Sequence, residues 1–459
     1  MPAELALKIP ADVEKVLDQL LDVGYDAYVV GGAVRDAVLG IDSHGTWDLT
    51  TNARPEETQK LFKRALYNNR FGTVVVRSGS HEVEVTTYRT EAGYADHRRP
   101  DSVAFTPSLE EDLARRDFTI NAMAWRPPRG GRPSMLVDRF GGRTDLEAHV
   151  LRAVGDPDER FKEDALRMLR AVRFATLLDL RIDPKTAEAI RRNAALAETL
   201  SGERIQQEIV KMLWAPRPSA AFEMLSDLGI LAVICPELEE CKLTPQDKAA
   251  ADNVFQHSLA TLDAAADAKP PADLPLRLAS LFHDIGKPET FSDGHFFGHD
   301  HVGASKARAI LRRWKFDKET VDEVTHLIRH HMFWYQSEWT DSAVRRFIRN
   351  VRLENVEALY ALRRADNIGS GARQPKMYAL EALWRRIQEE IAAANAFSLR
   401  DLKIGGNDLK SELGMAAGPE MGRVLNALFE RVTDDPKLNT RETLLALARE
   451  EVGKPRDPS

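Results

Sequence analysis

The spacing of apolar residues changes once along this chain, close to residue 150. Before that point, helical segments are mixed with short runs of alternating or consecutive apolar residues. These runs occupy residues 27–30, 73–76, 82–88 and 134–137. From residue 158 onward, apolar residues recur every three or four positions, a spacing typical of helices. The chain therefore predicts an α+β protein, with a small mixed sheet in its first part and an almost entirely helical remainder.

Proline-rich segments divide the chain further. Residues 126–133 mark a loop between predicted strands, 215–218 a joint between helices, and 269–275 an interruption of the helical part. We expect four regions on this basis. They occupy residues 1–150, 151–218, 219–395 and 396–459.

A glycine pair follows the first apolar strand. Gly31 and Gly32 come directly after residues 28–30, and a short predicted helix then carries Arg35. Glycines let backbone N–H groups approach a phosphate closely, the start of a helix favours negative charge, and an arginine adds a forked contact. Asp48, on the next predicted strand, supplies the hard oxygen that Mg²⁺ prefers. In isolation, an ordinary turn would also account for the glycine pair.

Composition narrows the class of protein. The chain has 459 residues, enough for about three domains. Its formal net charge is −7, so an RNA-binding surface has to be a local basic patch. Two cysteines, Cys235 and Cys241, lack the spacing of a disulfide framework or a zinc site. With no apolar run of about 18 residues, we expect a cytoplasmic protein without a membrane span or a secretion signal.

Long motifs occur in a fixed order along the chain. They occupy residues 24–48, 82–89 (EVEVTTYR), 94–105, 108–124, 137–142 (VDRFGG) and 159–175. In order and spacing they resemble the class II tRNA nucleotidyltransferases, which are the CCA-adding enzymes and their bacterial poly(A) polymerase relatives. The resemblance implies a nucleotidyltransferase head at 1–150 and a neck at 151–218 that selects the nucleotide. It also implies a body at 219–395 and a tail at 396–459 that hold the tRNA acceptor end.

The strand after the glycine pair departs from the family pattern. The family carries two aspartates two positions apart there, whereas this chain has Thr46 and Asp48. Side chains at this spacing lie on one face of a strand, which lets one strand hold two Mg²⁺ ions. Asp42 or His44 could supply the missing ligand. We predict Asp48 and, on a neighbouring strand, Glu84 as the metal ligands of the head; an exposed strand glutamate is the alternative for Glu84.

The segment 163–173 carries the predicted nucleotide-selecting residues. By the resemblance, Asp164 and Arg167 read the Watson–Crick edge of the incoming base, so that the protein itself serves as template. Three residues apart on a helix, the two would share one face, and a plain ion pair would look the same. Arg170 and Arg173 continue this stripe toward the triphosphate or the RNA backbone.

Arg116, Asp117 and Asn121 belong to the motif ARRDFTINA. We expect Asp117 and Asn121 at a strand-to-helix turn, where by the resemblance they shape the ribose side of the site and Arg116 serves phosphate. A helix N-cap is the alternative role for Asp117. Together with the glycine pair and Arg35, which we assign to phosphate binding and to catalysis, these residues complete the predicted nucleotide site.

Two further segments concern RNA. Residues 94–100 look like the segment that helps CCA-adding members of the family switch from C to A, which argues against a purely A-adding enzyme. In the tail, Gly405, Gly406 and Asp408, with Gly418 before a helix, resemble the family tail, where backbone N–H groups meet RNA phosphates. A helix–turn–helix connector is the alternative for this part of the tail.

A second set of metal-binding residue types lies in the body, in the order used by HD-type metal phosphohydrolases. These residues are His257, His283, Asp284, His299, His331 and Asp366, with His330 as an alternative to His331. Imidazoles and carboxylates can hold Mn²⁺, Ni²⁺, Mg²⁺ or a similar divalent ion that activates water against a phosphoester. His283 and Asp284 follow an apolar run, and buried polar groups there need a partner. A relic of the fold that only grips tRNA is the alternative.

The sequence thus favours a CCA tRNA nucleotidyltransferase that uses CTP and ATP, with Mg²⁺ in the head and a divalent metal in the body. The rival interpretation is an HD phosphohydrolase acting on RNA ends or nucleotides, whose head has become an RNA-binding module. Thr46 keeps this interpretation open. A CC-adding or poly(A)-adding relative would differ only in specificity. The oligomeric state is left open.

Replacing Thr46 by aspartate would restore the second carboxylate of the metal-binding strand. Loss of one of two such carboxylates should slow the reaction by about 100-fold or more and spare nucleotide binding. We therefore expect Thr46→Asp to raise the incorporation of labelled CTP or ATP into tRNA sharply, and the uncharged Thr46→Asn to give no gain. Ordinary enzyme rates in the unchanged protein, with no gain in Thr46→Asp, would mean that another ligand such as Asp42 fills this place.

Overall fold

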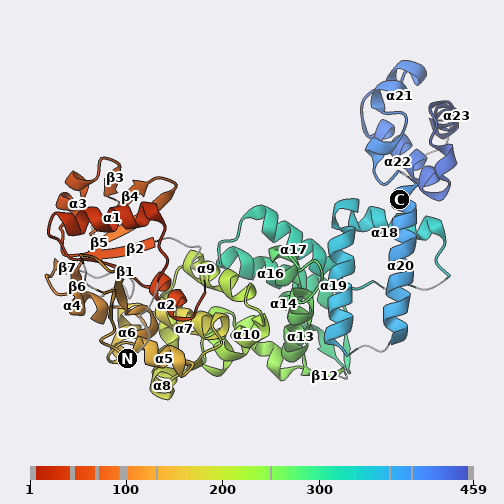
Figure 1. Ribbon diagram of the computed structural model, residues 1–459. Helices are drawn as coiled ribbons and strands as arrows, with labels where there is room; N and C mark the ends of the chain where they lie inside the picture. The colour runs from red at the N-terminus through yellow and green to blue at the C-terminus, as the bar shows by residue number, and fades with distance from the viewer. Residues whose placement is uncertain are drawn as a thin grey trace. The chain divides into compact units, whose positions relative to one another are not determined.

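The computed structural model describes most of the chain. The described residues are 7–41, 47–67, 72–93, 102–130, 133–248, 251–333, 335, 338–371, 374–393 and 396–452. Contacts group the chain into two units, Met1–Pro236 and Glu237–Ser459, and each is described by itself (Figure 1). Within the described residues, no helix is long and apolar enough to cross a membrane.

A seven-stranded mixed sheet forms the core of the first unit, in the order β3-β4-β5-β2-β1-β8-β9 (Figure 1). Its strands are β1 (Ala27–Val30), β2 (Trp47–Thr51), β3 (Ala65–Tyr67), β4 (Thr73–Ser78), β5 (His81–Thr87), β8 (Ala124–Arg126) and β9 (Met135–Val137). β2 and β5 pair in parallel, whereas the other neighbours pair antiparallel. β1 is buried along its length and β5 alternates between buried and more exposed positions. The predicted small mixed sheet is confirmed.

Helices cover the sheet because their apolar residues form one stripe. In α1 (Ala11–Asp22), the buried residues Val13, Val16, Leu17 and Leu20 recur at three- and four-residue spacing, and the helix packs on β1, β4 and β5. The other helices of this part are α2 (Gly32–Val38), α3 (Pro55–Leu61), α4 (Leu109–Ala114), α5 (Gly142–Glu147) and the 3-10 helix η1 (Thr119–Asn121).

The rest of the first unit is mainly helical. Its helices are α6 (Pro157–Glu163), α7 (Leu166–Leu177), α8 (Pro184–Asn193), α9 (Gly202–Leu213), α10 (Pro218–Asp227) and α11 (Leu231–Ile234). α7 packs on α9 and α10. The single helix expected through Asp164 is wrong, because Asp164 is extended (φ −144°, ψ 103°) between α6 and α7. The break is stabilised locally, since Asp164 Oδ1 accepts from the backbone N–H of Leu166, the first residue of α7, at 3.0 Å.

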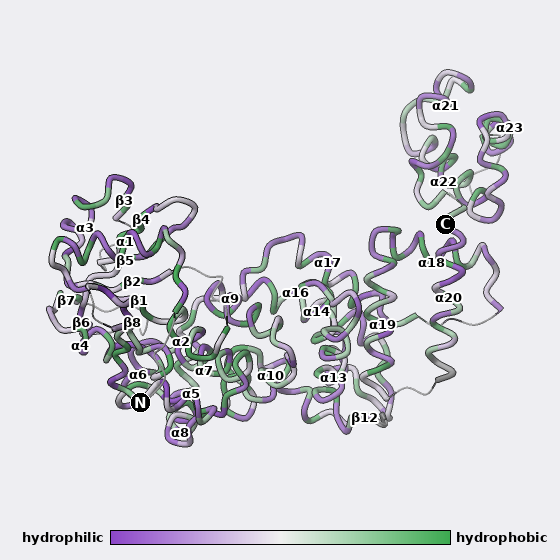
Figure 2. The backbone as a smooth tube through the Cα atoms, in the orientation of Figure 1, coloured by the Kyte–Doolittle hydropathy of each residue, from purple (hydrophilic) through white to green (hydrophobic). Residues whose placement is uncertain are grey.

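The second unit is mainly helical, as predicted. Its longer helices are α13 (Val254–Ala266), α14 (Leu274–Phe282), α16 (His299–Arg313), α17 (Lys318–His330), α18 (Asp341–Val351), α19 (Val356–Gly369), α20 (Gln374–Ala392), α21 (Gly406–Leu413), α22 (Pro419–Asp434) and α23 (Arg441–Val452). α13 packs on α14 and α19, and hydrophobic and hydrophilic positions alternate along these helices (Figure 2). A separate apolar cluster, which includes Leu409, Val424, Leu428 and Leu444, holds α21, α22 and α23 together.

Short two-stranded ribbons were not predicted. They are β6–β7 (Arg89–Ala92 with Ser102–Phe105), β10–β11 (Val150–Leu151 with Arg181–Ile182), β12–β13 (Pro245–Lys248 with Ala251–Asn253) and β14–β15 (Phe291–Ser292 with His295–Phe296). Most of these strands are two to four residues long and mix apolar with polar residues, so they lack the apolar runs that marked β1 and β9. The predicted division into four regions stays a prediction.

Candidate nucleotide site and candidate metal centre

The glycine pair borders the first candidate site. Gly31 follows β1 with φ 71°, a conformation that favours glycine, and Gly32 begins α2. A Cβ atom at Gly31 would lie 3.4 Å from Arg116 Nη1 and 3.7 Å from Asp48 Oδ2. The absence of a side chain at Gly31 therefore leaves space beside Arg116, the predicted phosphate-binding residue, and Asp48, the predicted metal ligand.

Asp48 and Glu84 lie opposite each other on the parallel strands β2 and β5. Burial and the neighbouring Glu84 carboxylate raise the pKa of Asp48 to about 6, while the positive charge of Arg116 acts in the other direction. A divalent cation between two adjacent carboxylates would remove their repulsion, and hard oxygen donors suit Mg²⁺. The two residues therefore fit the predicted metal. Outside the described residues lie Thr46, Asp42, His44 and the segment 94–100.

Asp117 is the centre of a buried hydrogen-bond network. Its Oδ2 accepts from Arg170 at 2.8 and 2.5 Å, and its Oδ1 accepts from Asn121 Nδ2 at 3.1 Å. Burial opposes ionisation, but Arg170 and Asn121 lower the pKa of Asp117 to about 2. The predicted strand-to-helix turn is wrong, because Asp117 lies between α4 and η1. The N-cap alternative is also wrong: Phe118 holds that position in η1, and the Asp117 carboxylate is occupied by Arg170 and Asn121.

Asp164 and Arg167 do not pair with each other, because the helix break turns their side chains to different partners. Arg167 donates to Glu163 Oε2 at 2.5 Å and to the Arg115 carbonyl at 3.0 Å. Asp164 Oδ2 accepts from Arg204 Nη2 at 2.8 Å. The alternative of a plain Asp164–Arg167 ion pair is therefore wrong, and both residues line the same cavity. Among the described residues, Arg204 Nη1 is buried without a hydrogen-bond partner.

Three arginines surround the ring of Phe174. The guanidinium carbons of Arg35, Arg170 and Arg173 lie 5.2, 5.3 and 4.3 Å from the ring centroid. Arg35 also donates to Asn121 Oδ1 at 3.0 Å. Burial lowers the pKa of Arg173 to about 10, which leaves the group charged at neutral pH. The uncharged Phe174 ring thus contacts three guanidinium groups and leaves each of them positively charged.

One cavity of about 540 Å³ collects these groups. Its lining residues that were predicted from the sequence are Gly31, Gly32, Arg35, Asp48, Arg116, Asp117, Asn121, Asp164, Arg167, Arg170 and Arg173. The lining residues that were not predicted are Arg115, Leu166, Phe174, Arg204 and Lys211. Glu84 adjoins Asp48 on the sheet but lies outside this lining. Eight basic and three acidic side chains face the cavity, so it suits a polyanion.

The helical spacing of polar residues along α9 could have predicted Arg204 and Lys211 as lining residues. In α9, Arg204, Glu208 and Lys211 recur at four and three positions and form a stripe beside the buried apolar residues of the same helix. Glu208 is itself buried and pairs with Arg173 at 3.1 Å. This polar stripe therefore belongs to the site rather than to the solvent face of α9.

The second unit gathers all the residues predicted for the HD metal site into one buried cluster. His257 lies on α13, His283 and Asp284 follow α14, His299 begins α16, His331 follows α17, and Asp366 lies on α19. His331, and not His330, belongs to the cluster. Asp284 is shared between two groups of potential ligands. Its Oδ2 lies 3.4 and 3.2 Å from Nε2 of His257 and His283, and its Oδ1 lies 3.4 and 3.6 Å from Nε2 of His299 and His331.

Hydrogen bonds decide which ring nitrogen faces this cluster. Nδ1 of His283, His299 and His331 donates in each case to the backbone carbonyl three residues earlier, at 2.8, 2.7 and 2.7 Å. Burial lowers the pKa of His283 and of His331 and so favours their neutral form. A neutral ring with Nδ1 bonded in this way turns an unprotonated Nε2 toward the cluster, which is the form that binds a divalent metal.

A close backbone contact brings Asp284 next to α16. A Cβ atom at Gly286 would lie 2.2 Å from the carbonyl oxygen of His299, so only glycine lets the two segments approach this closely. Lys287 Nζ lies 2.5 Å from Asp284 Oδ2. Burial opposes ionisation of Asp284, but the positive charge of Lys287 helps to hold the pKa of its carboxyl well below the usual range. The cluster therefore offers neutral imidazoles and an ionised carboxylate.

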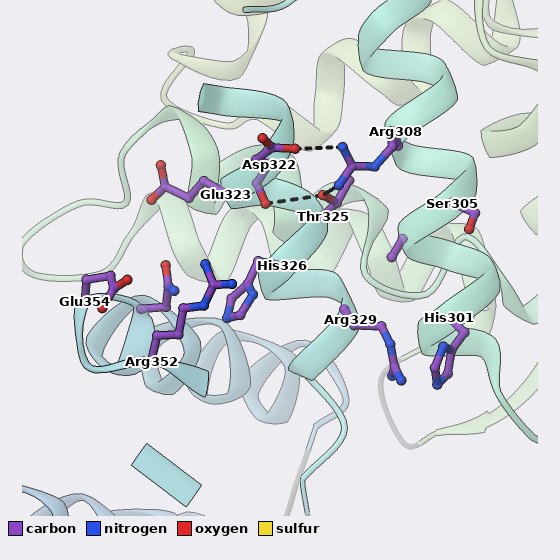
Figure 3. Close-up of a pocket in the computed structure, with 12 residues that line it drawn as sticks. His301, Ser305, Arg308, Asp322, Glu323, Thr325, His326, Arg329, Arg352 and Glu354 are labelled. Atoms are coloured by element: carbon purple, nitrogen blue, oxygen red, sulfur yellow. Dashed lines mark hydrogen bonds and ion pairs between the residues drawn. The ribbon is translucent and has the colours of Figure 1, made fainter. Parts of the chain in front are cut away.

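A larger polar cavity of about 750 Å³ lies between α16, α17 and residues 352–355 (Figure 3). Within it, Arg308 bonds to Asp322 and Thr325, both at 2.7 Å. The charged side chains of its lining, apart from histidines, are Arg308, Arg329, Arg352, Asp322, Glu323 and Glu354. Since arginines and carboxylates balance here, this cavity lacks the positive excess that marks the cavity of the first unit.

Three parts of the chain match models of known families. Residues 27–152 match the poly A polymerase head domain, residues 179–242 an RNA and SrmB-binding site of polymerase A, and residues 298–448 a tRNA nucleotidyltransferase domain 2. None of these three descriptions names an HD domain, so that assignment stays a prediction. The mixed sheet, its cavity and the matched head domain define a nucleotidyltransferase.

Individual relatives narrow the class. A CCA-adding enzyme from Streptococcus thermophilus is 32% identical over 464 residues, which cover 98% of each chain. Another, from Lactobacillus helveticus, is 48% identical over 213 residues, 46% of this chain, and the match spans 52% of that relative's length. The crystal structure of the Bacillus stearothermophilus CCA-adding enzyme in complex with CTP has a TM-score of 0.72 and 30% identity, covering 96% of this chain and 97% of that one. The chain belongs to the family of CCA-adding enzymes.

Removing Arg204 should disturb the part of the cavity that holds Asp164. The carboxylate would lose its 2.8 Å partner and the fixed orientation that goes with it. We expect Arg204→Ala to raise KM for CTP and ATP about tenfold or more, measured as single-nucleotide incorporation into tRNA. The matched control is Arg192→Ala, because Arg192 also pairs with a distant aspartate, Asp158, at 2.6 Å but lies outside the cavity. Equal losses in the two variants would contradict a role of Arg204 in the site.

Proposed function

We propose that this chain completes the 3′ end of tRNA by adding C, C and A from CTP and ATP, without a nucleic-acid template. The observation that carries the proposal is the cavity of the first unit, where eight basic side chains meet Asp48 beside a glycine pair. A nucleoside triphosphate and an RNA end are both polyanions, so both are attracted to such a cavity. The relatives named as CCA-adding enzymes, one of them solved with CTP, support these substrates.

In the proposed reaction, the tRNA 3′-hydroxyl attacks the α-phosphate of the bound nucleotide and pyrophosphate leaves. Arg35 and Arg116, next to the glycine pair, hold the phosphates. Asp48 and Glu84 are the residues that would hold Mg²⁺, which when bound neutralises phosphate charge and favours ionisation of an attacking hydroxyl. The contribution of the chain's own residues is chiefly to position the two reactants.

Base choice in this proposal depends on fixed hydrogen-bonding groups. The Asp164 carboxylate accepts from the amino group that cytosine and adenine share, and Arg167 donates to ring acceptors of either base. Uracil and guanine present a carbonyl oxygen where cytosine and adenine present that amino group, so they would leave the carboxylate without a donor. Asp117, oriented by Arg170, faces the ribose and can accept from its 2′-hydroxyl.

A single incorporation assay tests this function. Transfer RNA that lacks its 3′-terminal CCA is offered CTP alone, ATP alone or both, and the products are separated by length. A CCA-adding enzyme adds two C residues from CTP alone and completes the end when both nucleotides are present. Addition that stops after two C residues in the presence of both nucleotides, or a run of A residues, would replace the proposal by a CC-adding or a poly(A)-adding enzyme. If even the Thr46→Asp variant adds no nucleotide, the head is not a working transferase and the rival interpretation, an RNA-binding module, replaces the proposal.

Loss of the Arg167 guanidinium should relax the choice of base. We expect Arg167→Ala to bring the kcat/KM values of UTP and GTP about tenfold or more closer to those of CTP and ATP. Arg167→Lys is the matched variant, since it keeps the charge but loses the forked donor geometry, and it should also discriminate poorly. If all four nucleotides lose activity equally in Arg167→Ala, the residue is only structural.

A second activity is favoured by the metal cluster of the second unit. We propose that His257, His283, Asp284, His299, His331 and Asp366 hold Mn²⁺, Ni²⁺, Mg²⁺ or a similar ion and that the centre hydrolyses phosphoesters of RNA ends or nucleotides. The supporting observation is Asp284, whose two oxygens each face a pair of histidine Nε2 atoms. A bound ion would supply hydroxide at neutral pH. The protein's part is to keep the imidazoles neutral and aimed at the ion.

Removing the two adjacent ligands should abolish this second activity alone. We expect the double variant His283→Ala, Asp284→Ala to lose metal-dependent hydrolysis of a phosphomonoester or a 2′,3′-cyclic phosphate. Nucleotide incorporation measured in the Thr46→Asp background should survive, because the transferase cavity is lined entirely by residues of the first unit. His330→Ala is the control, since His330 neighbours His331 in sequence but lies outside the cluster. The second activity is contradicted if the purified protein binds no divalent metal and hydrolyses neither substrate with Mg²⁺, Mn²⁺, Ni²⁺ or Co²⁺. The second unit would then serve only to hold RNA.

A further inference from the structure

A single arginine of the second unit connects three helices. Arg345, on α18, is buried, with 7% of its surface exposed. Its Nη1 donates to both carboxylate oxygens of Glu390 on α20, at 3.0 and 2.9 Å. Its Nε and Nη2 donate to the backbone carbonyls of Thr433 and Asp434, at 2.6 and 3.0 Å. The guanidinium group therefore holds α18 to α20 and to α22 at once.

The acceptors of Arg345 suit a buried positive charge. Thr433 and Asp434 are the last two residues of α22, and the last carbonyls of a helix have no partner within the helix. These carbonyls also form the negative end of the helix dipole, which attracts a cation. Glu390 balances the charge, as a buried arginine requires. Because a planar guanidinium donates in fixed directions, these bonds restrict the angles between the three helices.

Two further contacts between α18 and α22 are ion pairs at the surface. Arg346 Nη2 lies 2.6 Å from Asp434 Oδ1, and Arg349 Nη1 lies 2.6 Å from Glu430 Oε1. Both carboxylates are exposed, and water screens such pairs, so they contribute little to holding the helices in place.

The helices α21, α22 and α23, which we call the tail helices, share an apolar core of their own. Within the described part of the chain, the apolar cluster that holds them together is drawn from residues 396–448. This cluster stabilises the tail helices internally. Their orientation relative to α18 depends instead on contacts such as the buried hydrogen bonds of Arg345.

We propose that Arg345 is a positioning residue for tRNA, which orients the tail helices so that they contact the RNA. The inference rests on the proposed addition of C, C and A to tRNA. The match to a tRNA nucleotidyltransferase domain 2 spans residues 298–448 and includes both α18 and α22. Gly418, a predicted RNA-contacting residue, directly precedes α22, and Arg345 holds the other end of this helix. Over its 16 residues α22 is about 24 Å long, so a rotation of about 20° at the held end moves its start by about 8 Å.

A displacement of this size matters for an RNA that one chain holds at two places. The second contact strengthens binding only if it lies where the first contact presents the RNA. Loss of the fixed orientation should therefore weaken the binding of tRNA. Binding of CTP should not change, because CTP occupies only the cavity of the first unit.

The first measurement is steady-state incorporation of CTP into tRNA by the full-length protein in the Thr46→Asp background. Arg345→Lys keeps the positive charge but loses the forked donor geometry. We expect it to raise KM for tRNA about tenfold or more, with little change in KM for CTP or in kcat. The matched control is Arg346→Ala, because Arg346 lies on the same helix and pairs with the same Asp434 at the surface. It should keep the KM for tRNA of the unchanged protein.

The second measurement is the distance between two spin labels, one on α20 and one on α21. The labels are attached at Gln388→Cys and Lys410→Cys, two exposed positions, whereas the native cysteines are buried. We expect Arg345→Lys to broaden the distribution of distances and Arg346→Ala to leave it unchanged. If Arg345→Lys does not fold, Glu390→Gln takes its place, since it removes the balancing charge with little change of shape, and it should shift both measurements in the same direction.

An unchanged KM for tRNA in Arg345→Lys overturns the inference, whether or not the distance distribution broadens. An equal rise of KM for tRNA and for CTP, or a fall of kcat alone, also overturns it, because a merely structural residue would act in this way. If no variant incorporates nucleotide, the proposed function fails, and equilibrium binding of tRNA that lacks its CCA end decides the inference separately. Binding about tenfold weaker in Arg345→Lys than in Arg346→Ala then supports it, and equal binding overturns it.

Discussion

The pairing of buried charges between segments far apart in the sequence is the constraint on which the transferase cavity depends. An unpaired buried charge costs on the order of 3 to 5 kcal/mol, so each inward-facing arginine needs an acceptor. Asp117 holds Arg170, which ties the segment before η1 to α7, and buried Glu208 holds Arg173, which ties α9 to α7. The contacts that pack these elements together are thus the contacts that place positive charge around one cavity.

This pairing is incomplete, and the incompleteness is what suits the cavity to a ligand. In the described part of the chain, Arg116 Nε, Arg173 Nε and Arg204 Nη1 are buried without a hydrogen-bond partner. Donors left open in this way can turn to phosphate or base acceptors when a nucleotide enters. Acidic partners outside the lining, among them Glu163 and Glu208, let the elements pack, while the lining itself presents eight basic side chains against three acidic ones. The balanced charges of the cavity between α16 and α17 mark the opposite case.

In the second unit, neutral groups rather than charged ones fix the orientation of the candidate metal ligands. Backbone carbonyls accept hydrogen bonds from the Nδ1–H groups of His283, His299 and His331. These hydrogen bonds fix the orientation of each ring without adding charge. One ionised carboxylate, Asp284, then stands between the rings, and the close approach at Gly286 brings it there. Five helices contribute to the cluster or end beside it, so the geometry of the cluster is set by helix packing rather than by any one motif.

The sequence by itself determined the elements and the inventory of chemical groups. Alternating and helical spacing predicted the mixed sheet and the helices, because these depend on local pattern and residue type. The family resemblance carried by the motifs around Gly31, Asp117 and His283 indicated which residues to expect at the sites. Only the tertiary structure decided the partners. The helix break at Asp164 gave that carboxylate to Arg204 and gave Arg167 to Glu163, where a continuous helix would have placed both on one face. Arg204 and Phe174 were likewise not predicted, because a side chain's role at a site depends on contacts between distant segments, which periodicity along one segment does not encode.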